Sequence, residues 1–184
     1  GTGATGTDNL GIGFASATVG DAGFQEFAAD IGNPALFTIY FDGRSFVPPV
    51  INASGIVNGA SFVQNQQGFA PGSYLSLFGT GLSEVTRLFY TPYLPLSLGN
   101  VSVSFDVPAQ NISLPATVVY VSPEQVNVQI PWELAGQTSA QIKLSIGLTS
   151  SAVLTIPINS FSPGFFEYLD WGGNSYLGAQ DAGF

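Results

Sequence analysis

Residues that commonly perform enzyme chemistry are scarce in this 184-residue chain. It contains no histidine and no cysteine, which excludes a Ser-His-Asp triad, a cysteine nucleophile and a His/Cys zinc site. A Ser-Lys pair would have to use Lys143, the only lysine, which stands between Ile142 and Leu144 in an alternating run. Neighbouring strand residues point to opposite faces, so we expect Lys143 to face away from the core. This orientation also argues against an intramolecular isopeptide bond, which needs a buried lysine.

Paired carboxylates and calcium loops are the remaining catalytic and metal-binding options. Glycosidases hold two carboxylates within about 5–10 Å, whereas Glu124 and Glu133 flank one extended run that separates them by about 30 Å. The stretches "DWGGN" (170–174) and "GTDN" (6–9) lack the acidic residues of a calcium loop, so turns are the preferred interpretation. We therefore expect a protein that is not an enzyme, with no catalytic residue, no metal and no cofactor.

Composition narrows the possible partners. Twelve acidic residues against Arg44, Arg87 and Lys143 give a net charge of −9, which disfavours nucleic acid and anionic membrane surfaces. The longest charge-free stretch, 45–83, is rich in Gly, Asn, Gln and Pro, so no membrane insertion is expected. The chain begins with Gly1 and contains no methionine, and we interpret it as a mature, secreted chain that functions outside the cell or at its surface.

Only 8% of the residues are charged, while 45% are hydrophobic. One interpretation is a β-protein with a surface of Ser, Thr and Asn. The other is a surface that further chains cover. Composition does not decide between them.

Short β-rich runs recur along most of the chain, separated by Gly, Pro, Asn or Ser, and the spacing predicts an antiparallel sandwich. A hairpin is also predicted over 35–50, because two β-rich runs flank Asp42-Gly43, a pair suited to a type I′ turn. Pro48-Pro49 marks the best domain boundary. A turn of helix is possible over 25–31. The seven strand candidates are 73–79, 85–90, 100–107, 116–122, 125–132, 140–147 and 152–158.

Five motifs carry a family resemblance: "GIVNGASF" (55–62), "FAPGSYLSLFGTGL" (69–82), "LPLSLGNVSVSF" (94–105), "VVYVSPEQVNVQIPWEL" (118–134) and "SSAVLTIPINSFSPGFF" (150–166). In order and content they resemble the uncharacterised Solibacter-type C-terminal domain family of acidobacterial secreted proteins. The resemblance covers about 110 residues and implies an immunoglobulin-like sandwich of the IPT/TIG kind, without an implied activity. Two departures stand out. The usual short turn after "VSV" is replaced by "FDVPAQNISLPA", and the first 50 residues lie outside the family domain.

Two further features bear on ligands. Asn52, Asn100 and Asn111 stand in Asn-x-Ser sequons, so glycans are possible partners, although three sequons can arise by chance in this composition. We expect Trp132 to cap one end of the core, with ligand stacking as the alternative.

The strand 9–20, "NLGIGFASATVG", alternates large apolar residues (Leu10, Ile12 and Phe14) with Gly and Ala. This pattern predicts a strand with one face to bury. Either it folds back onto its own sandwich, or it is donated to a neighbouring subunit as an added edge strand. We favour donation, which makes these three side chains the subunit interface of a head-to-tail homopolymer.

The expected organisation is therefore all-β. A β-rich extension (1–50) precedes an immunoglobulin-like antiparallel sandwich (51–166), and a Gly-rich tail (167–184) follows it. The favoured function is a non-enzymatic subunit of an extracellular, pilus-like filament or sheath. A carbohydrate-binding or adhesive module of a larger surface protein and an inert spacer remain as alternatives.

Overall fold

The computed structural model describes residues 23–30, 38–45, 47–64, 68–89 and 91–178, and it contains almost only strands and turns. Contacts divide the chain into two compact units, Gly1–Val47 and Pro48–Phe184. The division falls beside the Pro48-Pro49 pair. The all-β expectation is confirmed.

In the first unit, β1 (Gly23–Asp30) and β2 (Thr38–Ser45) form a two-stranded antiparallel sheet. The hairpin predicted over 35–50 is wrong, because Asp42 and Gly43 lie inside β2 and pair with Glu26 and Gln25. A two-residue turn and a continuous strand are both compatible with β-rich flanks, and the partner strand β1 selects the continuous strand. The possible helical turn over 25–31 is also wrong, since β1 occupies residues 23–30.

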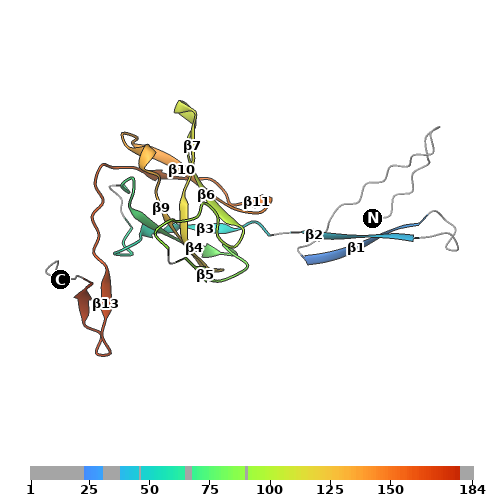
Figure 1. Cartoon of the computed structure of the whole chain (residues 1–184), viewed down its shortest axis with the longest axis horizontal. Coiled ribbons are helices and arrows are strands. Elements are labelled where there is room, and N and C mark those ends of the chain that lie inside the picture. Colours follow the sequence, from blue (N-terminus) through green and yellow to red (C-terminus); the bar gives the residue numbers. More distant parts are fainter. Residues whose placement is uncertain (1–22, 31–37, 46, 65–67, 90, 179–184) are drawn as a thin grey trace. The chain divides into compact units, whose positions relative to one another are not determined.

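The second unit contains two five-stranded sheets (Figure 1). The first has the order β3-β4-β9-β8-β5. Its strands are β3 (Val50–Asn58), β4 (Tyr74–Thr80), β5 (Arg87–Leu88), β8 (Thr117–Val121) and β9 (Gln125–Gln129).

In the second sheet, β6 (Val101–Val107) lies between β7 (Ile112–Pro115) and β10 (Ser139–Ile146). Both β11 (Thr149–Ser150) and β12 (Leu154–Pro157) pair with the other edge of β10. Two short 3-10 helices, η1 (Pro108–Gln110) and η2 (Trp132–Leu134), lie in connections.

One hydrophobic core joins the two sheets. Leu75, Leu77 and Val128 from the first sheet belong to the same buried cluster as Phe105 and Leu144 from the second. Each of the seven predicted ranges contains a strand, and six of these strands contribute inward residues to the core. The exception is the range 85–90, where β5 has only two residues and both are exposed. The order β3-β4-β9-β8 facing β6-β10-β12 is compatible with an immunoglobulin-like sandwich, which stays a prediction.

Residues 167–184, expected as a Gly-rich tail, contain a further two-stranded sheet. It consists of β13 (Glu167–Leu169) and β14 (Ser175–Leu177) (Figure 1). Asp170 organises the turn between them. Its Oδ1 accepts hydrogen bonds from the backbone N–H groups of Gly172 and Asn174, at 2.8 and 2.9 Å. The turn interpretation of "DWGGN" is thus confirmed.

Candidate functional site

The predicted interface residues Leu10, Ile12 and Phe14 lie outside the described residues, so the donor strand stays a prediction. The described residues do contain surfaces that a strand, a ligand or another copy of the chain can contact. Three of them are built from neighbouring elements: a groove between β3 and β12, a polar surface on β6, β7 and β10, and the C-terminal hairpin of β13 and β14.

An irregularity in β3 opens the first surface. Ile51 pairs with Gly79 of β4 and Ile56 pairs with Leu77, so the four residues between them oppose only one residue of β4. Position 55 has no room for a side chain, because a Cβ on Gly55 would lie 2.6 Å from the carbonyl oxygen of Phe78. Asn52, Ala53 and Ser54 are exposed. This is a β-bulge in an edge strand, a feature that commonly modifies sheet edges.

The opposite wall is β12, which pairs with β10 along one side. Every second residue along this edge directs its backbone N–H and C=O toward β10. Ile158 is one of these residues, because its N–H donates to the carbonyl of Thr138 at 3.0 Å. The backbone groups of Thr155 and Pro157 therefore point away from β10. The Pro157 carbonyl accepts the N–H of Phe69 at 3.0 Å, which closes the edge at that end.

Between these walls lies a groove of about 370 Å³, which we call the edge groove. Its floor is apolar, because Ile56, Phe69 and Ile156 are core residues exposed by 6% or less. None of the residues that line it is charged. The full lining is Ala53, Ile56, Gln64, Phe69, Leu154, Thr155, Ile156 and Pro157.

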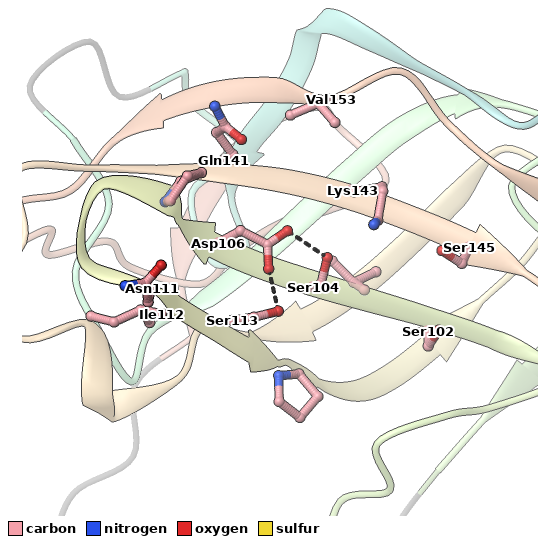
Figure 2. A pocket seen from close by; sticks show the side chains of 13 residues that line it. Ser102, Ser104, Asp106, Asn111, Ile112, Ser113, Gln141, Lys143, Ser145 and Val153 are labelled. Atoms are coloured by element: carbon pink, nitrogen blue, oxygen red, sulfur yellow. Dashed lines mark hydrogen bonds between the residues drawn. The ribbon is translucent and has the colours of Figure 1, made fainter.

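The second surface is a shallow depression of about 760 Å³ on the outward face of β6, β7 and β10. Figure 2 shows Asp106 at its centre, where Oδ1 accepts the Ser113 hydroxyl at 2.5 Å and Oδ2 accepts the Ser104 hydroxyl at 3.1 Å. Lys143 is the direct cross-strand neighbour of Ser104. Ile142 and Leu144 are fully buried, so Lys143 does face away from the core as predicted. None of the thirteen lining residues is aromatic.

The third surface is the C-terminal hairpin, where all six residues of β13 and β14 are exposed. Tyr168 and Tyr176 pair directly and stack, with ring centroids 5.4 Å apart. Large apolar side chains dominate the hairpin and the segment before it. Those exposed by 45% or more are Phe161, Phe165, Phe166, Tyr168, Leu169, Trp171, Tyr176 and Leu177. The sequence signal was present as closely spaced aromatics, but it gave no indication of their exposure.

Trp132 does not cap the core. Its side chain is 67% exposed, and its ring lies against Gly72, which has a φ of +80°. The core end is instead filled by Leu134, two residues later, which is fully buried. The three sequon residues Asn52, Asn100 and Asn111 are all exposed, so each is accessible for modification.

Within the described residues no three His, Cys, Asp or Glu side chains come together as metal ligands. Glu124 and Glu133 lie on either side of β9, and both are exposed. No helix in the described ranges is long and apolar enough to cross a membrane.

A scan against known protein families finds no match to the chain, and a search of curated proteins finds no relative. The resemblance to the Solibacter-type domain therefore rests on the sequence motifs alone.

Proposed function

We propose that this chain is a non-enzymatic structural protein, a secreted subunit that assembles with copies of itself into an extracellular filament. Successive subunits are joined by donation of the strand 9–20. The immunoglobulin-like sandwich serves as the body of each subunit. No nucleic acid, membrane insertion, metal or cofactor takes part.

The observation that carries this proposal is the apolar C-terminal hairpin. A two-stranded hairpin is at best marginally stable in water, and β13 and β14 have no third strand among the described residues. Eight large apolar side chains in and before the hairpin are exposed by 45% or more, and exposed apolar surface on this scale commonly marks a contact with a partner. The covering partner is assigned as another copy, because the scarcity of charge extends over the whole chain and suits packing against itself.

The test is assembly of the full chain compared with two truncations, measured by sedimentation and negative-stain electron microscopy at micromolar concentration. The full chain is expected to form filaments. Removing residues 1–20 is expected to leave monomers, because Leu10, Ile12 and Phe14 are lost. Removing only residues 1–8 is the matched control and is expected to preserve filaments. Polymerisation of the longer truncation, or a full chain that stays monomeric, overturns the proposal.

A second candidate is a carbohydrate-binding module, and the polar depression around Asp106 favours it. Hydroxyl, carboxylate, amide and ammonium groups converge there from three strands, as polar groups do in ligand sites. The absence of an aromatic platform in its lining places this function second. Titration with oligosaccharides tests it, with Asp106→Asn expected to lower affinity and the distant Asp170→Asn expected to leave it unchanged.

A further inference from the structure

We propose that the edge groove between β3 and β12 is the acceptor site, and that its occupant is the segment 9–20 of a second copy of this chain. This inference rests on the proposed function, since it specifies where the donated strand binds. It assigns a role to five parts of the chain, namely the donated segment 9–20, β3, Gln64, Phe69 and β12.

The chemistry of the groove matches that of the segment. In an extended strand, Leu10, Ile12 and Phe14 would share one face, and the floor offers Ile56, Phe69 and Ile156 for that face to cover. Neither the segment nor the lining contains a charged residue. In a chain of net charge −9, an uncharged segment enters such a groove without burying an unpaired charge.

The backbone of β12 supplies the pairing edge. Ile156 and Ile158 direct their side chains inward and their backbone groups toward β10, whereas Thr155 presents an exposed side chain and an outward-pointing N–H and C=O. Pro157 has no N–H and its carbonyl already accepts the N–H of Phe69, so the pairing edge of β12 consists of the N–H and C=O of Thr155. An added strand therefore meets the backbone groups of Thr155 beside an apolar floor, and strand addition combines main-chain hydrogen bonds with side-chain contacts.

The wall formed by β3 keeps the groove open. The bulge moves Ala53 out of the ladder with β4, and its methyl group is the smallest side chain in the lining of the groove. The Nε2 of Gln64 donates to the carbonyl of Ser54 at 2.6 Å, which holds this wall in place. A large side chain at position 53 would fill the space that the donated strand needs.

The first experiment uses the full chain with Ala53→Trp, and Ala109→Trp in the exposed turn η1 as the matched control. Ala53→Trp is expected to raise the critical concentration for assembly at least about tenfold, while the control assembles as the wild type does. Circular dichroism and thermal unfolding establish that both variants are folded. Normal assembly of a folded Ala53→Trp variant overturns the groove assignment.

The second experiment does not depend on the folding of that variant. The chain has no cysteine, so introduced pairs report proximity cleanly. Gly11 and Gly13 have the same strand parity, opposite to the apolar face, and Thr155 is exposed on β12. Gly11→Cys or Gly13→Cys combined with Thr155→Cys is therefore expected to yield an oxidised ladder of dimers, trimers and longer species. Gly13→Cys with Ser150→Cys, outside the groove, is the control.

The outcomes separate the two proposals. Oxidised monomers that migrate faster show that the strand folds back onto its own sandwich, and this overturns both. If neither Gly11→Cys nor Gly13→Cys forms a cross-link with Thr155→Cys, the assignment of the groove is overturned. Strand donation itself then stands, provided that removal of residues 1–20 abolishes assembly. If that truncation still polymerises, the proposed strand donation itself fails, whatever the groove variants do.

Discussion

The indole of Trp132 occupies the space where a side chain on Gly72 would begin. Ring atoms Cζ2, Cη2 and Cε2 overlap the position of a Cβ on that residue, whose φ of +80° already favours glycine. Gly72 is also fixed by its neighbours, since its N–H donates to the carbonyl of Ile130 and its own carbonyl accepts the amide of Gln129, both at 2.9 Å. The exposed side chain of Trp132 therefore packs directly over the turn at Gly72.

Gly72→Ala is expected to destabilise the sandwich by about 2–4 kcal/mol, from backbone strain together with overpacking against the ring. In a Trp132→Ala background the overlap is gone, and the same substitution is expected to cost only about 1–2 kcal/mol. Denaturant unfolding of the four proteins of this double-mutant cycle measures the coupling. Equal costs in the two backgrounds would show that the ring does not rest on Gly72 in solution.

Ser76 of β4 is fully buried, and its Oγ has no hydrogen-bond partner. A buried hydroxyl without a partner retains its desolvation penalty, so Ser76→Ala is expected to raise the free energy of unfolding by about 1 kcal/mol. Ser73→Ala is the matched control. The Ser73 hydroxyl donates to the carbonyl of Ala70 at 2.7 Å, and its loss is expected to lower stability by about 0.5–1.5 kcal/mol. Urea denaturation of both variants measures whether the free energy of unfolding rises, as expected for Ser76→Ala, or falls, as expected for Ser73→Ala.

The turn of the C-terminal hairpin is expected to open in acid. Hydrogen bonds from the Asn174 side chain, and then from backbone N–H groups, lower the pKa of Asp170 below 3.8. A carboxyl group with a depressed folded-state pKa stabilises the folded turn above its ordinary pKa, and this contribution is lost as the pH falls through the lower value. The exciton circular dichroism of the stacked Tyr168 and Tyr176 should therefore fade below about pH 3.8. Asp170→Asn should remove that transition, and a transition that persists in this variant would assign it to another group.

Trp171 should contribute more to assembly than an equally exposed aromatic elsewhere. If another copy covers the hairpin, Trp171→Ser removes a large apolar contact and is expected to weaken assembly by about 1–2 kcal/mol, or roughly 5–30-fold in critical concentration. Tyr93→Ser is the control, since Tyr93 is 87% exposed in a loop and lies outside the hairpin. Sedimentation assays on both variants measure the difference. Identical critical concentrations would indicate that the hairpin is not covered.

Alternation predicted the strands well because it records which residues face the core. Val103 and Phe105 in β6, like Ile142 and Leu144 in β10, are buried and separated by partly exposed residues, and this local pattern needs no knowledge of partners. The pairing of Asp42 was missed because the choice between turn and strand depends on β1, at least twelve residues earlier in the chain. β3 was missed because its bulge at 52–55 interrupts the alternation.

The edge groove was beyond prediction for a related reason. Ala53 and Ile156 line one cavity although about a hundred residues separate them, and neither has a chemically distinctive side chain. The Asp170 turn, by contrast, was predictable, because its donors and acceptor all lie within five consecutive residues.

The two sheets end differently on their two sides. On one side β5 has only two residues and includes Arg87, and β7 has four residues and ends at Pro115. Short strands, charge and proline are features that prevent edge-to-edge pairing. The opposite side holds the edge groove. If the chain assembles by strand donation as proposed, pairing at the β5 and β7 edges is disfavoured, so the filaments should remain separate threads instead of broad mats. The two tips of each thread should differ in their rate of elongation, because one presents a donor segment and the other an acceptor.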